Sequence, residues 1–386
     1  MLTSQSRILT THAGSLPRPP ALAELHGRRS RGEEVDPAAL QRAVEEATAA
    51  TIAAQVEAGI DVGNDGEQAR ESFFTYVQHR MTGFGDTSRR AFMRDLLDHP
   101  DFIELALPRF SRIKVNLMTA PAAISDVTYR DTTEVEAECD LVAGAPFAQT
   151  FMTAASPGIV AAAMDNRYYA TREEYVRAVA TALRTEYRFI IERGLLLQID
   201  APDLAMERHT LFADRPLHEF LAWVELVVDA INGALEGIDP AAVRLHVCWG
   251  NYEGPHTLDV PLHEILPLLY RAHVGALVVS MANARHAHEH ACFERRSLPD
   301  SMVLVAGVID TTSNYVEHPE VVADRLVRVA RVVDDPRRVI AGTDCGFDTS
   351  AGLGDVAPSL VWEKLRALRA GADLATTRLL KPRRLS

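Results

Sequence analysis

Eight short apolar segments recur along this chain, and segments with helical spacing separate nearly all of them. Most of these segments are apolar at successive positions, as in strands that are buried on both faces. This alternation predicts a parallel sheet, and eight units predict an α/β fold of the closed (β/α)8 TIM-type barrel. A doubly wound open sheet is the alternative, but no G-x-G-x-x-G sequence opens a helix after a strand. The segments lie near residues 8, 60, 149, 195, 242, 276, 302 and 339.

The chain length of 386 residues suits one such barrel, so we expect a single domain over residues 1–386. From about residue 84 to residue 146 the regular spacing gives way to polar, proline-bearing and acidic stretches. We predict that this part is an insertion that caps the barrel.

The charge balance restricts the partners of the protein. Acidic residues number 53 against 40 Lys and Arg, which gives a formal net charge of -13 and disfavours nucleic acid or an anionic membrane surface. No apolar run approaches transmembrane length, no cleavable signal pattern opens the chain, and the four cysteines are too scattered for a disulfide scaffold. We therefore predict a soluble cytoplasmic protein that acts on small molecules, with a homo-oligomer as one option for its assembly.

A histidine and a cysteine stand two positions apart at the end of one apolar segment. In a strand, residues i and i+2 point the same way, so His246 and Cys248 present an imidazole and a thiol side by side. A His-x-Cys sequence alone is more often a packed pair, but Cys345 follows another apolar segment of the same kind. Two thiolates and an imidazole are three of the four ligands of a tetrahedral zinc ion.

Other polar residues also follow predicted strands. In a (β/α)8 barrel the carboxyl ends of the strands converge on one mouth, where active sites are built. The same mouth is therefore expected to hold His12, Ser15, Glu67, Asp200 and Asp310.

In this order, the motifs resemble those of the cobalamin-independent methionine synthase family. The likeness is strongest to short members that match only its C-terminal catalytic barrel, a group that includes the zinc-dependent epoxyalkane:coenzyme M transferase. It extends from about residue 8 to residue 352. The motifs are Thr11-His12-Ala13-Gly14-Ser15-Leu16-Pro17-Arg18, Gly66-Glu67, Gln198-Ile199-Asp200-Ala201-Pro202-Asp203, His246-x-Cys248 and Thr343-Asp344-Cys345-Gly346.

The resemblance implies a zinc ion on His246, Cys248 and Cys345 that binds a substrate thiol and makes it a thiolate nucleophile. By the same resemblance the loop that carries His12, Gly14 and Ser15 would bind a substrate carboxylate. Glu67 and Asp200 would hold an amino group, as in homocysteine. The barrel argument, apart from the resemblance, places Asp310 in the same mouth, where we expect it to support the site or to contact the substrate. Two carboxylates around an ammonium group are also a plain match of charge.

One position departs from the family pattern. A glutamate ligand is expected three residues before an Asn-x-Arg-His sequence, and here Ser280 stands three residues before Asn283. The fourth position of the zinc ion would then be open to water, to substrate or to another side chain. The replacement ligands considered are His286, His288, Glu289 and His290, although a solvated helix start is the commoner role for such a run.

The leading hypothesis is a zinc-dependent methyl or alkyl transferase that acts on a homocysteine-like thiol. The donor stays open between a methylfolate, a methylated corrinoid protein and a small sulfonium compound. An alternative is the opening of an epoxide by coenzyme M, for which Arg18, Arg70 and Arg285 are the nearest candidates to bind a sulfonate. Further alternatives are a zinc-dependent lyase or hydrolase, and a barrel that binds zinc or a thiol without catalysis.

Overall fold

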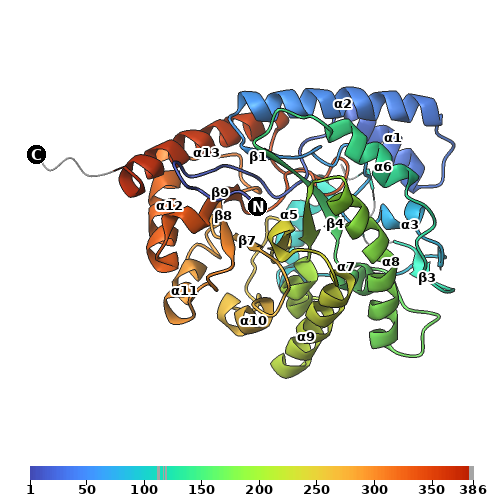
Figure 1. Cartoon of the computed structure of the whole chain (residues 1–386). Helices are drawn as coiled ribbons and strands as arrows, with labels where there is room; N and C mark the ends of the chain where they lie inside the picture. The colour runs from blue at the N-terminus through green and yellow to red at the C-terminus, as the bar shows by residue number, and fades with distance from the viewer. Residues whose placement is uncertain (111–113, 116, 118–119, 382–386) are drawn as a thin grey trace, which may run out of the picture.

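A parallel sheet of seven strands forms the centre of the computed structural model, which describes residues 1–110, 114–115, 117 and 120–381 (Figure 1). Neighbouring strands are paired in the order β1-β4-β5-β6-β7-β8-β9. From β4 onward, each strand pairs with the next one along the chain, as successive β/α units require. The strands are β1 Val62–Gly63, β4 Gln149–Ala155, β5 Leu196–Asp200, β6 Val243–Val247, β7 Ala276–Ser280, β8 Val303–Ile309 and β9 Val339–Thr343.

The first predicted strand is reduced to two isolated bridges that link the edges of this sheet. Thr10 bridges in parallel to Ala341 of β9, and Thr11 bridges in parallel to Val62 of β1. The barrel arrangement is thus confirmed, with a shorter first strand than we predicted. The Asp61 carboxylate accepts a hydrogen bond from the Thr10 backbone N–H at 3.0 Å, so a side chain takes the place of a strand partner there.

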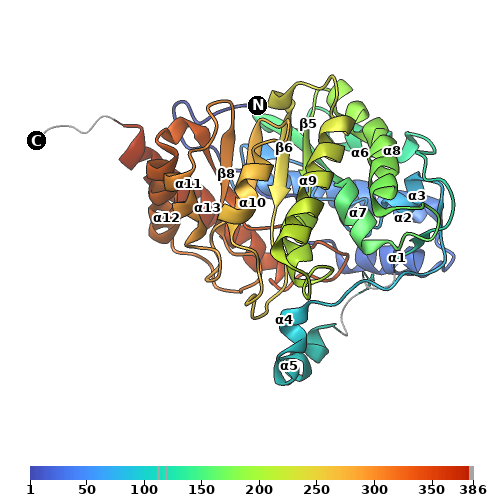
Figure 2. The ribbon, with the colours of Figure 1, turned by 90° about the horizontal axis from the view of Figure 1, so that it is seen from below.

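Helices cover the outside of the sheet (Figures 1 and 2). Thr171 caps the N-terminus of α8 Arg172–Glu192, because its hydroxyl accepts from the Glu174 N–H at 3.1 Å. The Glu174 carboxylate in turn accepts from the Ala170 N–H at 3.1 Å. The helices are α1 Pro20–Ser30, α2 Pro37–Glu57, α7 Pro157–Ala163, α8 Arg172–Glu192, α9 Leu217–Ala234, α10 Leu262–Leu269, α11 Cys292–Arg295, α12 Pro319–Val333 and α13 Pro358–Leu379. Short 3-10 turns are η2 Pro202–Leu204, η3 Met206–His209, η4 Pro240–Ala242, η5 Glu289–Ala291 and η6 Pro336–Arg338.

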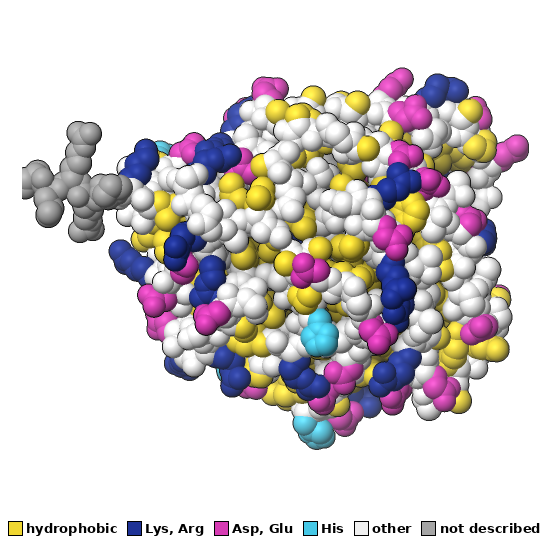
Figure 3. Space-filling view, in the orientation of Figure 1, with side chains coloured by type: hydrophobic (Ala, Val, Ile, Leu, Met, Phe, Trp, Pro, Cys, Tyr) yellow, Lys and Arg dark blue, Asp and Glu magenta, His cyan; other side chains and the backbone are white. Residues whose placement is uncertain are grey.

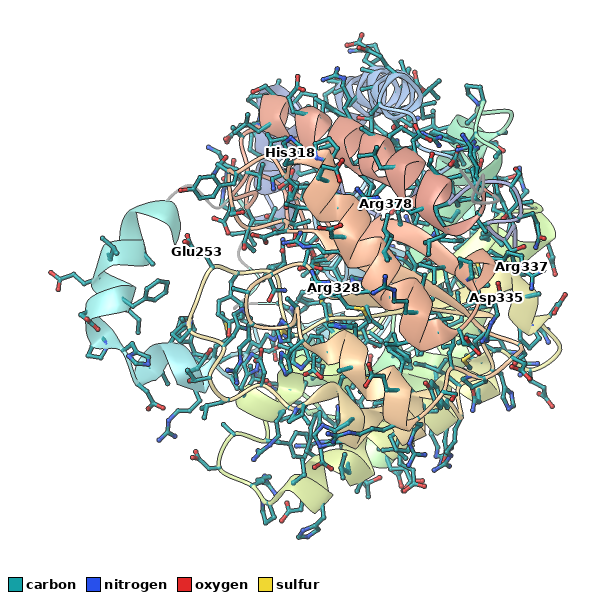
Figure 4. The ribbon with its side chains drawn as sticks, turned by 90° about the vertical axis from the view of Figure 1, so that its left-hand side faces the viewer. Glu253, His318, Arg328, Asp335, Arg337 and Arg378 are labelled. Carbon is teal, nitrogen blue, oxygen red and sulfur yellow. The ribbon has the colours of Figure 1, made fainter. Side chains whose placement is uncertain are left out.

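The last two helices lie side by side on the outside of the molecule (Figure 4). Arg378 of α13 donates to the Asp324 carboxylate of α12 at 2.7 Å, which joins the two helices by an exposed ion pair. Such a pair adds little stability by itself, so the apolar residues between the helices hold them together.

The region predicted as an insertion contains small elements of its own. Its strands β2 Phe84–Gly85 and β3 Ala122–Ala123 pair antiparallel. The helices before and within it are α3 Val77–Arg80, α4 Arg94–Leu97, α5 Pro100–Phe110 and α6 Thr133–Val142. Helices α4 and α5 project from the main body (Figure 2).

The surface carries charges of both signs. On the face drawn in Figure 3, basic and acidic side chains are interspersed with scattered apolar ones. In the described part of the chain, no helix is long and apolar enough to cross a membrane.

Candidate metal centre and substrate pocket

Three potential metal ligands meet at the mouth of the barrel. His246 and Cys248 come from the end of β6, and Cys345 follows β9. Their ligand atoms all lie within 4.8 Å of one another, and the two Sγ atoms are 3.9 Å apart. Two sulfurs bound to one tetrahedral zinc ion lie about 3.8 Å apart, since each Zn–S bond is about 2.3 Å. The donor set and its spacing therefore fit zinc, as the sequence predicted.

A carboxylate fixes the orientation of the imidazole. Asp200 Oδ1, at the end of β5, lies 3.0 Å from His246 Nδ1 and also accepts from Gln198 Nε2 at 2.7 Å. Gln198 in turn accepts from Arg244 Nε at 2.7 Å inside the barrel. With Nδ1 on the carboxylate, Nε2 is the nitrogen left for a metal. Asp200 thus positions the His246 ring, a role that the sequence analysis did not predict. The signal in the sequence was that Arg244 and His246 lie on the same face of one strand, next to Gln198 and Asp200 of the neighbouring strand.

The two cysteines form no disulfide, and each thiol is within hydrogen-bond distance of the other. This contact lowers the pKa of Cys248 and raises the pKa of Cys345. Burial raises the pKa of both thiols, and the neighbouring His246 lowers that of Cys248. A divalent metal would bind both groups as thiolates and release the protons that they carry.

Ser280, where the family pattern has a glutamate, lies next to these ligands. Its hydroxyl donates to the Asp344 carbonyl oxygen at 2.7 Å. The Asp344 carboxylate accepts from the backbone N–H groups of residues 281–283, so it is used within the loop after β7. In the described part of the chain, no fourth His, Cys, Asp or Glu joins the three ligands in a common site.

The histidine-rich run after Ser280 lies elsewhere. His286 bonds the Asn283 side chain through Nδ1, and its Nε2 lies 2.9 Å from Asp259. Its ring also stacks on Trp249 with centroids 4.0 Å apart. The run forms a loop and the short turn η5 Glu289–Ala291 ahead of α11, so it precedes a helix and is not itself helical. His288 is exposed, His290 bonds a backbone carbonyl, and Glu289 accepts from a backbone N–H.

A cavity of about 730 Å³ opens at the three ligands. Ser15, Glu67 and Asp200 line its polar part, as predicted. The rest of its wall is mainly apolar, and much of that wall comes from the region between β2 and β3. The apolar lining residues include Phe73, Phe92, Met93, Ala106, Leu117 and Met206. Glu253 stands on a loop of the same mouth, beside the projecting helices (Figure 4).

Glu67 is a buried carboxyl group with one unused oxygen. Its Oε1 accepts from the Thr153 hydroxyl at 3.0 Å, while Oε2 is buried without a hydrogen-bond partner among the described residues. Burial and the nearby Asp200 carboxylate raise the pKa of Glu67 to about 8. A cation placed between the two carboxylates would satisfy Oε2 and offset their repulsion.

The loop after Thr11 was predicted to bind substrate through His12, Gly14 and Ser15, but these residues have different surroundings in the structure. Ser15 lines the cavity, whereas His12 is buried beside it with Nε2 at 2.8 Å from Gln55 Oε1 and Nδ1 accepting from the Gly14 N–H. Gly14 has φ +130°, and a Cβ there would lie 2.8 Å from Glu67 Oε1. His12 and Gly14 therefore shape the loop and its packing on Glu67, and Ser15 is the polar residue of the loop that lines the pocket.

Asp310 and Arg285 belong to a second cavity of about 440 Å³. Ser280 and Cys345 also line this space, so it adjoins the metal ligands on the β7 side. The structure thus places Asp310 near the site but outside the cavity that holds Glu67. Its Oδ1 accepts from both the N–H and the hydroxyl of Thr312 at 3.0 Å.

A substitution at position 280 tests the metal site directly, because Ser280 and Cys345 line the same cavity. Ser280→Glu is expected to add a carboxylate ligand and to lower the zinc dissociation constant by about tenfold or more, because a fourth charged ligand replaces a weaker one. The measurement is chelator competition at fixed pH. Ser280→Gln has nearly the same size without the anionic oxygen and is the control. Equal affinities of the Glu and Gln variants would mean that position 280 does not reach the metal.

The fold and the site define a class: an α/β barrel with a His-Cys-Cys centre and an acidic substrate pocket at the carboxyl ends of its strands. Residues 113–360 match the family model described as the catalytic domain of cobalamin-independent synthase. The chain belongs to this family, which supports an enzyme of the methyl- or alkyl-transfer type.

Named relatives agree with this placement. The chain is 25% identical over 348 residues to a methionine synthase of Saccharolobus solfataricus, with 88% of this chain and 87% of that protein covered. It is 24% identical over 404 residues to the 2-hydroxypropyl-CoM lyase of Xanthobacter autotrophicus, covering 97% and 96%. A B12-independent methionine synthase from Shewanella sp. W3-18-1, solved with selenomethionine, has the same fold, with a TM-score of 0.71 at 21% identity and coverage of 97% and 99%.

Proposed function

We propose that the protein is a zinc-dependent methyl or alkyl transferase whose acceptor is a thiol that also carries an amino group, as homocysteine does. The observation that carries this proposal is the unpartnered Oε2 of Glu67, beside Asp200, in the cavity that opens at the three ligands. A cavity with two buried carboxylates and a sulfur-rich metal site is complementary to an ammonium group and a thiol on one molecule.

Each residue then has a defined task. His246, Cys248 and Cys345 hold the metal, and Asp200 orients the imidazole through Nδ1. When bound, zinc supplies a Lewis acid that stabilises a substrate thiol as its thiolate at neutral pH. Glu67 and Asp200 bind the ammonium group, and the Ser15 hydroxyl is placed to donate to the acceptor's carboxylate.

The transfer itself needs few further groups. The thiolate sulfur forms a bond to the electrophilic carbon, and the bond from that carbon to its donor breaks with the electron pair leaving on the donor. The thiol proton is lost before this step. The apolar wall that includes Phe92 and Met93 excludes water from the nucleophile.

The arginines favour an amino acid over coenzyme M as the acceptor. Arg18 donates to the Glu67 and Arg70 carbonyl oxygens, and Arg70 pairs with Glu138, so both are engaged within the protein. Arg90 lines the main cavity but pairs with Glu207 at 2.9 Å. Among the described residues that line this cavity, no arginine or lysine lacks an acidic partner, whereas a sulfonate needs such a group.

Coenzyme M is retained as the second acceptor, with an epoxide as its electrophile, because of one observation. The relative named 2-hydroxypropyl-CoM lyase matches 97% of this chain, a larger share than the methionine synthases of archaea match. In that case Arg285, at the second cavity, is the candidate for the sulfonate.

Zinc-edge X-ray absorption tests the function and separates the two acceptors. The zinc-loaded protein should show two sulfur ligands, rising to three when homocysteine is added, because the substrate thiol takes the open position. Coenzyme M at the same concentration is the matched comparison. If a third sulfur ligand appears with coenzyme M and not with homocysteine, the acceptor is coenzyme M and not an amino acid. If zinc keeps two sulfur ligands with every thiol, the result contradicts thiol activation.

A further inference from the structure

A chain of three side chains leads from a buried arginine to the pocket. Arg70 Nη1 donates to the Thr153 hydroxyl oxygen at 3.0 Å and to the Thr153 carbonyl oxygen at 2.8 Å. The Thr153 hydroxyl then contacts Glu67 Oε1 at 3.0 Å. Thr153 lies on β4, and sequence reasoning did not single it out.

The chemistry of the arginine sets the direction of both hydrogen bonds. A guanidinium group can only donate, so the Thr153 oxygen accepts from Arg70. Thr153 donates its single hydroxyl hydrogen to Glu67 Oε1. Any proton that Glu67 itself carries is consequently on Oε2, the atom that has no partner among the described residues.

Arg70 is held firmly in this orientation. Its Nη2 donates to Glu138 at 2.8 Å, and its guanidinium lies 4.3 Å from the centre of the Tyr76 ring. Arg70 and Glu138 are almost completely buried, with 1% and 3% of their side chains exposed. Arg70 therefore acts on Glu67 in two ways, through the Thr153 hydroxyl and through its own charge, which lowers the pKa of Glu67.

We propose that Thr153 is a positioning residue that directs the exchangeable proton of Glu67 to Oε2, so that Glu67 releases this proton when the ammonium group of an amino acid binds. The inference rests on the proposed function, because it requires an acceptor with an amino group. The protonated carboxyl becomes a carboxylate, the ammonium keeps its three hydrogens, and one proton leaves to solvent.

The groups that face Glu67 agree with this exchange. Burial has the largest effect, and Asp200 and Asp65 also raise the pKa of Glu67, while Arg70 and Arg18 lower it, with a value of about 8 as the result. The empty site is therefore mostly protonated at pH 7. A bound ammonium group adds a positive charge next to Oε2, which favours the ionised form.

The test counts protons on binding. L-Norleucine, an amino acid without a thiol, is titrated into the purified protein by calorimetry in buffers of different ionisation enthalpy, so that no proton can come from a substrate thiol. The wild type should release about one proton at pH 7 and almost none above pH 9, since Glu67 is ionised there before binding.

Substitutions at Thr153 then show whether this residue controls the proton. Thr153→Val removes the donor to Oε1, so the affinity at pH 7 should fall by about tenfold and the midpoint of proton release should rise by about one pH unit. Thr153→Ser keeps the hydroxyl and should restore the wild-type values. Thr153→Ala replaces the Val variant if that variant does not fold, as judged by its thermal unfolding.

The outcomes separate the inference from the proposed function. Binding of L-norleucine without proton release, or a Val variant with the wild-type midpoint and affinity, overturns the role of Thr153 and leaves the acceptor class intact. A wild type that does not bind L-norleucine overturns the amino-acid acceptor, and this inference falls with it.

Discussion

Cys248→Ser and Cys345→Ser are each expected to lose nearly all bound zinc while the barrel stays folded. A serine hydroxyl is a poor ligand for zinc at neutral pH, and two remaining ligands hold the ion far more weakly than three. Thiol alkylation should fall by about a thousandfold or more with the metal. Mass spectrometry of the purified protein measures its zinc content, and far-UV circular dichroism shows whether the barrel stays folded.

Cys292→Ser is the matched control for this loss. Cys292 is also a buried free cysteine, but it lies on α11, away from the three ligands. It should keep its full metal content, so that a loss in the other two variants cannot be assigned to the removal of any buried thiol. Full metal content in both Cys248→Ser and Cys345→Ser would contradict the site.

The meeting of the three candidate ligands could be predicted from the sequence, because the convergence of strand ends in a barrel does not depend on the details of each strand. Once eight strand units are recognised, their carboxyl ends must converge, and His246, Cys248 and Cys345 all stand at such ends. The same argument placed Glu67 and Asp200 correctly in one cavity. Neither position depends on the exact length of a strand.

Other features could not be predicted because they depend on partners far along the chain. The histidine run was considered as a source of a replacement ligand, yet its His286 lies beside Asp259. His209 and His256 also lie within 2.9 Å of the Asp259 carboxylate. This arrangement uses residues from three separate segments. The spacing of residues in the sequence does not indicate that the three imidazole rings contact the Asp259 carboxylate instead of a metal ion.

The same limit applies to the region from 84 to 146. Its loose pattern indicated an insertion, but the pattern does not reveal which side chains reach the pocket. Phe92 and Met93 line the cavity because their segment lies over the barrel mouth. Their place in the cavity wall therefore depends on tertiary structure alone.

Glu67→Gln is expected to weaken amino-acid binding by about a hundredfold and at the same time to stabilise the protein. The loss of affinity follows because an amide cannot supply the negative charge that pairs with a buried ammonium group. Binding of L-norleucine by calorimetry at pH 8 measures it. Glu253→Gln makes the same change at the exposed rim of the cavity and should alter the affinity by less than about threefold.

The gain in stability has a defined dependence on pH. The folded state raises the pKa of Glu67 to about 8 from its ordinary value of 4.5, so between these values the folded protein holds a proton that the unfolded chain has lost. Stability must then decrease as pH rises through this window, and the loss is complete above pH 8. Glutamine has no such proton, so the variant should unfold at a temperature higher by roughly 2 °C or more at pH 8 and by less at pH 5. A variant that is less stable than wild type at pH 8 would show that the Glu67 carboxylate is already paired with a cation inside the folded protein, which would leave no place for the acceptor's ammonium group.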